Sequence, residues 1–598
     1  MSATRPQKLA DTLVVILLGA ALAIAQVLIG GTRLVFSLPA YAVIAAASIL
    51  ALATLRRPKP GANAACLFGS ALFFGYVIAR ALLSPVPYVA RTDLYIVLGA
   101  LLVYGVTVTT FTDARARLAL VGFLLVGAMV HTGIGAIQFR DGDDFMLLPF
   151  LARADYGRRA SGFYVCPNHL AGFLEVIAIF GVSTVCWSRL PIWLKLFCAY
   201  ATAVAYAGAV LTGSRGGYLS IGASLLVFAG LSIFVLRGTS GTLPWKIAGA
   251  GFLFAAFAGA AVYLSVRTSD FLTERAGNIA DVSNVRVDLW RAAIEQWKLA
   301  PAFGTGSATY RYYGRKFRAP SMQLDPLEAH SDYVQLLSEY GAVGALGFAG
   351  FLAVHLRAGG RAFRRLGDKR VAVASRLLSN NLALNLGALG AVAAYLVHSA
   401  FDFNLHIPAN ALVLAFVFGV LANPGAWLAG TEGTPAPRRW IPRLAVALLG
   451  LVMLVQTARL WPAEYFAEKA RVALRSGDAG AAIFFANKSV DYDQTNPEVF
   501  AYLGRARLGI GFETANPRAQ TSLYLAGADA LEAARALAPL EENYPLTLGM
   551  LYDLLGRYAE GEWMLDLALD LDPRGEAVQQ YYQAHLARWR AAANRPRN

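Results

Sequence analysis

The chain has little charge for its length, and it has no cysteine framework. Charged residues make up 15% of its 598 positions, whereas a soluble domain usually carries about 25%. The four cysteines, Cys66, Cys166, Cys186 and Cys198, have no CxxC spacing and mostly lie in apolar runs. This pattern excludes a disulfide scaffold and a cysteine-rich metal site. We expect all four to be small apolar residues of the interior.

Long apolar runs take the place of the missing charge. Hydrophobic residues make up 57% of the chain and the mean hydropathy is +0.48, which is typical of a polytopic membrane protein. A helix needs about 20 apolar residues to cross a bilayer. By this measure the sequence predicts thirteen spans: 11–30, 34–55, 62–83, 92–111, 116–137, 168–187, 191–211, 216–236, 246–266, 334–356, 379–400, 407–427 and 441–460.

Basic residues gather in alternate loops between these spans, and such loops usually face the cytoplasm. The residues on this side are Arg5, Lys8, Arg56, Arg57, Lys59, Arg115, Arg117, Arg237, Lys246, Arg357, Arg361, Arg364, Arg365, Lys369, Arg370, Arg376, Arg438, Arg439 and Arg443. The long segments 138–167 and 267–333, and everything after the last span, then lie on the outer side. We attribute the net charge of +15 to orientation in the membrane and expect no nucleic-acid partner.

Residues 461–598 are more charged than the predicted membrane domain at 1–460. Their apolar residues recur at helical spacing. Pro539 and Pro573 lie 34 residues apart, and 544–558 reads as a helix, a glycine turn and a second helix. This resembles a tetratricopeptide repeat; a generic helical bundle is the alternative. The predicted fold class is all-α, with about 12–13 transmembrane helices and a soluble C-terminal helical repeat domain. We expect the repeats to bind a protein partner and to carry no chemistry.

His330 stands where the outer segment 267–333 meets an apolar helix. Asp332 follows it, and Glu339 lies about two helical turns further on. Polar groups at this depth cost free energy, so they usually have a function. We therefore take His330 as the candidate catalytic residue. Glu339 is either a supporting group or a buried structural carboxylate.

Two arginines lie beside helix ends on the outer side. Arg215 occupies a very short turn, 211–218, and is followed by two glycines. Glycine lets the backbone approach a ligand closely, and the planar guanidinium of arginine suits phosphate. The alternative is an arginine that binds lipid headgroups. Arg159 lies near the entry to the span 168–187 and is a second candidate anion contact.

Two further arginines, Arg286 and Arg291, lie beside the apolar stripe of a predicted helix in the outer segment. On the same face, three histidines, His330, His398 and His406, together with Asp332 and Asp402 suggest a metal site, and His398, Asp402 and His406 are spaced by fours. The proline at 408 argues against one helix through all three. We favour hydrogen bonds that support the region of His330. Glu175 is the one charged group near the centre of a span that could belong to a polar path.

Five short elements together resemble the O-antigen ligase and O-antigen polymerase superfamily of bacterial envelope glycosyltransferases, over roughly residues 10–425. They are Phe163-x-x-x-Pro167-Asn168, Ser214-Arg215-Gly216, Arg286 followed by Trp290, Gly304-Thr-Gly306, and His330-Ser-x-Tyr333 running into Glu339-x-Gly341-x-x-Gly344. The thirteenth span and the repeats depart from the simplest ligase plan. This departure bears on the identity of the substrate more than on the type of reaction.

The resemblance implies an inverting glycosyltransferase, multi-pass in the bacterial inner membrane, with its C-terminal domain in the periplasm. The donor would be an undecaprenyl-pyrophosphate-linked glycan, and the acceptor a hydroxyl of lipid A–core or a related lipid or glycan, with membrane lipids around both. It implies no cofactor and no metal. The expected roles are catalytic base for His330, pyrophosphate binding for Arg215, Arg286, Arg159 and Arg291, and support for Glu339, Asp332, His398, Asp402 and Asn168.

Other activities stay open on the sequence alone. Within the same chemical class, the chain could be a polymerase of O-antigen or exopolysaccharide, or a ligase that glycosylates protein hydroxyls. From a different class, a polysaccharide transporter or flippase with a docking domain would also have many helices. The charged groups cluster at the outer face rather than through the helix centres, which favours the glycosyltransferases.

Overall fold

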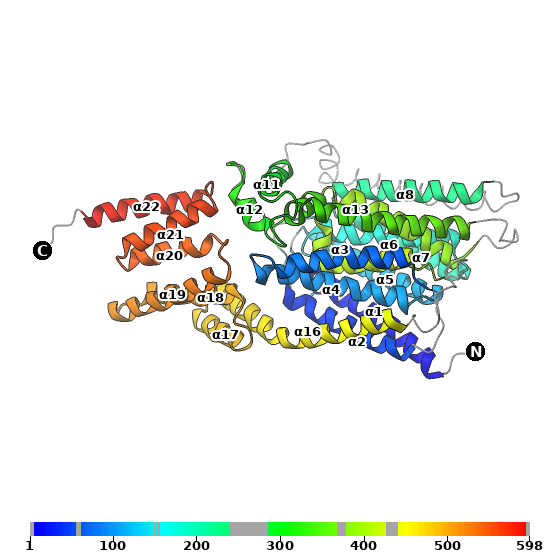
Figure 1. Cartoon of the computed structure of the whole chain (residues 1–598), viewed down its shortest axis with the longest axis horizontal. Coiled ribbons are helices and arrows are strands. Elements are labelled where there is room, and N and C mark those ends of the chain that lie inside the picture. Colours follow the sequence, from blue (N-terminus) through cyan, green and yellow to red (C-terminus); the bar gives the residue numbers. More distant parts are fainter. Residues whose placement is uncertain are drawn as a thin grey trace. The chain divides into compact units, whose positions relative to one another are not determined.

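A computed structural model describes the chain in residues 5–54, 61–142, 144–148, 151, 153, 156–237, 285–367, 378–425 and 440–593. Every regular element in these ranges is a helix (Figure 1), so the predicted all-α class is confirmed. The chain divides into two compact units. Unit 1 comprises Met1–Gly75, Tyr95–Val282 and Leu346–Leu454, and unit 2 comprises Tyr76–Leu94, Ser283–Ala345 and Val455–Asn598. Each is described by itself.

Unit 1 is a bundle of apolar helices. It contains α1 (Arg5–Val27), η1 (Ile29–Gly31), α2 (Leu34–Leu50), η2 (Ala51–Thr54), α5 (Ala114–Asp141), α6 (Pro167–Trp187), α7 (Ile192–Leu211), α8 (Arg215–Leu236), α14 (Asn380–His398), η4 (Asn404–His406) and α15 (Pro408–Ala422). Four helices have residues in both units: α3 (Ala64–Leu82), α4 (Pro87–Thr109), α13 (Asp332–Leu366) and α16 (Trp440–Arg475).

The predicted membrane spans agree with these helices. In the described residues, eleven helices are long and apolar enough to cross a membrane, and α15 is apolar but shorter. Each predicted span in these ranges falls on one of the twelve. The predicted span 246–266, the outer residues 267–284 and the basic residues Arg56, Arg57, Lys59, Lys246, Lys369, Arg370, Arg376, Arg438 and Arg439 lie outside the described residues.

Helix α6 lies inside the bundle of unit 1. Nearly all its residues are buried, and it packs against α5, α7, α8 and α14. A helix that is apolar on every side is stable only when neighbours surround it. Pro167 starts the helix, where its missing N–H costs nothing. This packing holds Asn168 at the first turn and Glu175 in the middle of the helix.

Some basic residues that we used for orientation have a structural role. Arg117 is fully buried, and its guanidinium donates to the carbonyls of Phe111, Thr107 and Asn423 at 2.7, 2.8 and 2.6 Å. Carbonyls at a helix end have no partner within the helix, so Arg117 satisfies the end of α4. Which side of the membrane this end faces stays a prediction.

The cysteines are unpaired. Cys66, Cys166 and Cys198 are buried, and Cys186 is partly buried. The expected place in the interior is thus confirmed for three of the four, whereas Cys186 is only partly enclosed.

Unit 2 holds the helices of segment 285–333 and of the C-terminal region. They are α11 (Val285–Leu299), α12 (Tyr310–Lys316), α17 (Ala479–Tyr492), α18 (Pro497–Glu513), α19 (Pro517–Leu537), α20 (Asn543–Leu554), α21 (Tyr558–Leu571) and α22 (Glu576–Ala593). Helix α16 continues through Pro462 to Arg475, beyond the predicted end of its span at 460. The domain boundary at 460/461 stays a prediction.

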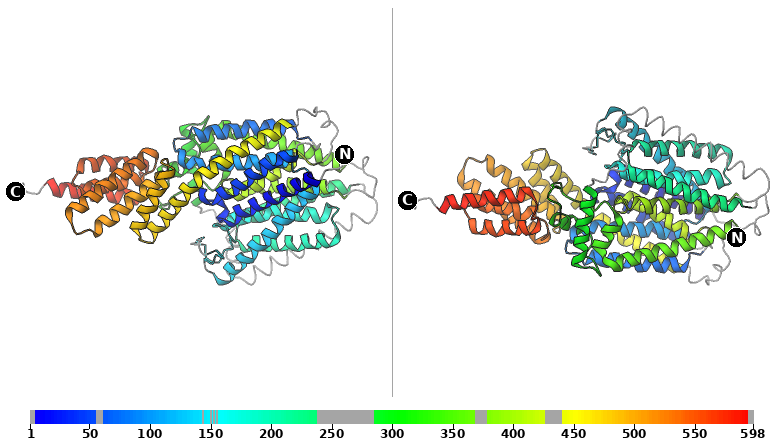
Figure 2. Two further views of the ribbon diagram at one scale, coloured as in Figure 1. Left: turned by 90° about the horizontal axis from the view of Figure 1, so that it is seen from below. Right: turned by 90° about the horizontal axis from the view of Figure 1, so that it is seen from above.

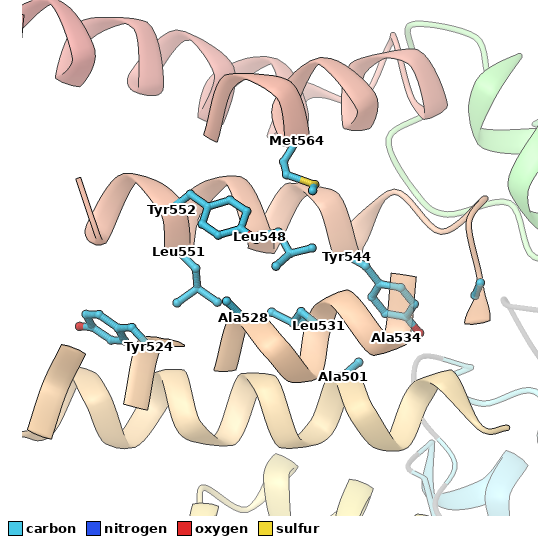
Figure 3. Close-up of a cluster of buried hydrophobic side chains, with 11 residues drawn as sticks. Ala501, Tyr524, Ala528, Leu531, Ala534, Tyr544, Leu548, Leu551, Tyr552 and Met564 are labelled. Atoms are coloured by element: carbon cyan, nitrogen blue, oxygen red, sulfur yellow. The ribbon is translucent and has the colours of Figure 1, made fainter. Parts of the chain in front are cut away.

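The C-terminal helices, α17 to α22, pack in sequence order, each against the next (Figure 2). The expected helix, glycine turn and helix are α20, Gly556 with a φ of +73°, and α21. Figure 3 shows how Leu531 of α19, Leu548 of α20 and Met564 of α21 share one buried cluster. This cluster provides the stacked apolar core that helical repeats need. Their assignment as tetratricopeptide repeats stays a prediction.

Candidate functional site

The ten candidate residues are divided equally between the two units. Unit 1 holds Arg159, Asn168, Arg215, His398 and Asp402, and unit 2 holds Arg286, Arg291, His330, Asp332 and Glu339.

The turn before α8 places Arg215 at the first residue of that helix. Gly213 has a φ of +61°, a conformation that glycine adopts without steric cost. The Ser214 hydroxyl then accepts from the N–H of Gly217 at 3.3 Å and caps the helix. The half-buried side chain of Arg215 has no hydrogen-bond or ion-pair partner in the part of the chain that the structure describes. Its hydrogen-bond donors are therefore not used within these residues.

Arg159 uses its guanidinium within the fold. Its Nε donates to the Thr212 carbonyl at 2.9 Å, and its Nη2 donates to Oδ1 of Asn168 at 2.6 Å. Burial lowers the pKa of Arg159, and nearby Cys166, Tyr156 and Asp402 partly offset the effect. Arg159 and Asn168 thus connect the loop before α6 with the end of α7. Of the two arginines, Arg215 is better placed to bind an anion.

His398 lies in a buried polar group whose central pair the sequence did not reveal. Its Nδ1 is 3.0 Å from both carboxylate oxygens of Glu175, and its Nε2 is 4.0 Å from Oδ2 of Asp402. All three side chains are at most 1% exposed. The sequence feature that could have predicted this pair is Glu175, because a carboxylate inside an apolar helix needs a partner.

The two glycines after Arg215 have a packing reason. A Cβ on Gly216 would lie 3.2 Å from the ring of His398, and one on Gly217 would lie 3.0 Å from Cβ of Ala171. The first turn of α8 therefore approaches α6 and α14 more closely than larger residues would allow. The sequence suggests that these glycines allow close approach to a ligand, and the structure adds the close approach of helices.

His330 has a left-handed backbone conformation. Its φ is +50°, which is uncommon for a residue with a side chain and occurs mainly where the surroundings impose it. The surroundings are ordered: the Ala329 N–H donates to Oε1 of Gln335 at 2.9 Å, and the Gln335 side chain also donates to Glu328. The half-buried His330 comes two residues before α13. Asp332, at the first turn of α13, is buried.

Glu339 is fully buried and supports a neighbouring helix. Its Oε1 accepts from the N–H of Tyr310 at 2.9 Å. Tyr310 begins α12, and the first N–H groups of a helix have no partner within it. The Tyr310 hydroxyl donates to the Leu289 carbonyl of α11 at 3.0 Å. Glu339 therefore connects α13 with α12, and through Tyr310 with α11.

The helix α13 is interrupted two residues after Glu339. Gly341 has a φ of +67° and a ψ of −171°, so the helical hydrogen bonds stop there. The loop 301–306 supplies replacements. Thr305 N donates to Ser338 O at 3.1 Å, Gly306 N to Glu339 O at 3.0 Å, and Ala342 N to Pro301 O at 2.9 Å.

This exchange explains why glycines stand in both elements. A Cβ on Gly304 would collide with the backbone of Glu339 and Tyr340, and one on Gly341 would collide with Ala302. Arg80 of α3 donates to the Gly304 carbonyl at 2.8 Å. The motifs Gly304-Thr-Gly306 and Glu339-x-Gly341 therefore form one structure, which holds the part of α13 that follows His330.

The two arginines of α11 have different surroundings. Arg291 is 74% exposed and pairs with Asp288 at 2.9 Å, and such surface pairs contribute little. Arg286 is half-buried and has no hydrogen-bond or ion-pair partner within the described ranges. The fully buried Gln296 donates to Thr305 and Thr309 at 2.7 and 3.1 Å. Sequence reasoning missed this glutamine, which fixes α11 to the loop 301–309.

A family model described as O-antigen ligase matches residues 199–349. The resemblance to the O-antigen ligase superfamily is thereby confirmed. The match indicates the O-antigen ligase/polymerase family, whose members are glycosyltransferase-like enzymes of the membrane. The matched stretch contains Arg215, Arg286, Arg291, His330, Asp332 and Glu339. A search of curated proteins finds no match to the chain.

Proposed function

We propose that the chain is a ligase-type glycosyltransferase, which moves a glycan from undecaprenyl pyrophosphate to an acceptor hydroxyl. The family match carries the proposal, because the stretch that matches the O-antigen ligase model contains Arg215, Arg286 and His330. The multi-pass helices agree with a donor held in the membrane. We further propose that the reaction takes place at the periplasmic face of the inner membrane, on lipid A–core or a related acceptor.

His330 is the proposed general base. A sugar hydroxyl is a poor nucleophile, and a histidine can remove its proton as the new bond forms. The acceptor oxygen attacks C1 of the sugar, and its proton passes to the imidazole. The bond from C1 to the pyrophosphate oxygen breaks with its electron pair, and the anomeric centre inverts. The ordered, left-handed backbone of His330 supports this role, since such conformations concentrate at functional sites.

Arg215 and Arg286 are the proposed ligands of the pyrophosphate. Negative charge grows on the leaving group as the bond breaks, and preorganised cations stabilise it. Both side chains are half-buried and keep their donors, as far as the described residues show. Arg159 and Arg291 take a lesser role, because Asn168 and Asp288 already engage them. The reaction as proposed uses no cofactor and no metal.

The lipid-linked species in a deletion strain test the proposal. Loss of a ligase leaves the complete undecaprenyl-linked glycan without transfer, whereas loss of a polymerase leaves single repeat units. Complementation with the wild-type gene should restore transfer, and His330→Ala should not. Full activity of His330→Ala in membranes would rule out the proposed base. Glycan transport across vesicles without any transfer would favour the transporter alternative.

A further inference from the structure

Two buried arginines lie near the end of α12, outside the proposed chemistry. Arg315 is 5% exposed and Arg318 is 2% exposed. Removing a guanidinium from water costs several kcal/mol unless charged partners surround it. The partners of Arg315 and Arg318 therefore identify the elements that the end of α12 contacts.

Arg315 binds the turn between α19 and α20. Its Nη1 donates to Glu541 at 3.0 Å and to Glu542, and its Nε is 3.3 Å from Asp325. Burial alone lowers the pKa of Arg315, but the facing carboxylates raise it overall. The arginine is thus held in its charged form by two residues of the C-terminal helices and one of its own loop.

Arg318 binds the turn between α21 and α22, which is the second turn after the one that Arg315 binds. Its Nη2 donates to Asp572 at 2.6 Å, and both side chains are almost fully buried. The backbone of this turn takes part as well. Arg574 donates to the Arg318 carbonyl at 2.8 Å, and Gln323 donates to the Arg574 carbonyl at 3.1 Å.

The two acceptor turns occupy equivalent places in successive helical pairs. Glu541 and Glu542 follow Pro539, and Asp572 precedes Pro573, one period of 34 residues further along the chain. Two arginines three residues apart thus contact two alternate turns of the stack, between α19 and α20 and between α21 and α22. An array of repeats offers this kind of regularly spaced surface to a ligand.

The same loop leads to His330. Asp325 contacts both Arg315 and Arg318, and only four residues separate it from His330. At its other end α12 is capped by Glu339. The segment from α12 to α13 is therefore held by α13 on one side and by the C-terminal helices on the other.

We propose that the C-terminal helices bind this segment of their own chain, and that Arg315 and Arg318 are positioning residues for His330. This inference rests on the proposed function for its catalytic part. The partner of the helices is then residues 310–330, and no separate protein is needed to explain the acidic turns. A displacement of about 1 Å in a catalytic group can reduce a rate about 100-fold.

Variants on both sides of one ion pair test the proposal in the full-length protein. Arg318→Ala removes the partner that lies on the loop, and Asp572→Asn removes the charge of the partner that lies on the C-terminal helices. For both we expect amide hydrogen exchange in residues 317–331 to rise about 10-fold or more. We expect kcat to fall about 10- to 100-fold, with the KM for undecaprenyl-linked glycan in proteoliposomes unchanged. Arg318→Lys should recover part of kcat.

Lys316→Ala is the matched control. Lys316 lies on the same helix end and pairs with Asp570 at 3.2 Å, but this pair is exposed. Exposed pairs contribute little, so both readouts should stay at the wild-type level.

The two readouts separate the parts of the proposal. Unchanged exchange in Arg318→Ala and Asp572→Asn would overturn the binding of the loop by the C-terminal helices. Raised exchange with unchanged kcat would overturn the positioning role. Should Arg318→Ala not fold, Asp572→Asn and Arg318→Lys provide the same two measurements. A wild-type protein that transfers no glycan would refute the proposed function, and the exchange result would still decide the binding.

Discussion

The side chain of Glu339 accepts a hydrogen bond from the backbone N–H of Tyr310 at 2.9 Å, so a buried carboxyl group on one helix caps another. This relationship predicts how Glu339 responds to substitution. Glu339→Gln keeps an acceptor and should retain turnover within about 3-fold, whereas Glu339→Ala should reduce stability by about 1–3 kcal/mol. Thermal unfolding and transfer assays on both variants check this. If Glu339→Gln lost as much turnover as His330→Ala, Glu339 would have a chemical role instead.

His330→Asn separates the imidazole from the backbone conformation. Asparagine tolerates a positive φ better than most residues, so this variant should fold like the wild type. Turnover should fall about 100- to 10,000-fold, because general-base catalysis contributes about this much. The measurement is kcat in proteoliposomes together with the melting temperature. A folded His330→Asn protein with normal kcat would contradict the base assignment.

Arg215→Lys retains the charge and loses the planar fork. Arginine and lysine are not equivalent where two phosphate oxygens are bound together, so kcat/KM for the lipid-linked donor should fall about 10-fold or more. Arg557→Lys is a suitable control, since Arg557 forms an exposed pair with Glu560 in the C-terminal helices. Equal activity of the two variants would mean that Arg215 does not bind the pyrophosphate.

Gly341→Ala should destabilise the protein strongly. The backbone there is left-handed, which costs an alanine about 1–2 kcal/mol, and the added Cβ would collide with Ala302. Gly350 lies on the same helix with no atom near its Cβ position, so Gly350→Ala should be tolerated. Comparison of the two melting temperatures makes the test. A tolerated Gly341→Ala would mean that α13 can form without the exchange of hydrogen bonds with the loop 301–306.

The pH dependence of stability should include a contribution from Glu542. Burial and the neighbouring Glu541 raise the pKa of Glu542 despite Arg315. A carboxyl whose pKa is raised on folding stabilises the fold below its usual pKa, and this contribution is lost as the pH rises through the raised value. The melting temperature should therefore fall between about pH 4.5 and about pH 8, and less so in Glu542→Gln. Identical pH profiles of the two proteins would contradict this.

Helix positions were predictable from sequence because the signal is local. Runs of about 20 apolar residues have one physical explanation in a chain with this composition, and each predicted span in the described residues is a helix. Helix ends were less accurate. Helix α16 runs to Arg475, because a helix that leaves the bilayer can continue with polar residues, and hydropathy marks only the membrane part.

The interior of the candidate site was predictable only in part. The order of the motifs around Arg215, Arg286 and His330 was recognisable along the chain. The pairing of Glu175 with His398 was not, because the partners are 223 residues apart and neither sequence neighbourhood shows the other. The exchange between Gly304 and Gly341 uses backbone groups, which leave no side-chain pattern. The acidic partners of Arg315 and Arg318 were not predictable either, because they lie 226 and 254 residues further along the chain.

The buried pair of Arg318 and Asp572 also restricts how the protein can evolve. A buried charge that loses its partner costs about 3–5 kcal/mol, so neither residue can change alone without a large penalty. Loss of the C-terminal helices from a descendant gene would leave Arg315 without Glu541 and Glu542 and Arg318 without Asp572, so the two guanidiniums would share Asp325 alone. Lineages that have shed these helices should therefore carry uncharged residues at the positions of Arg315 and Arg318, and lineages that keep the helices should keep both sides of each pair.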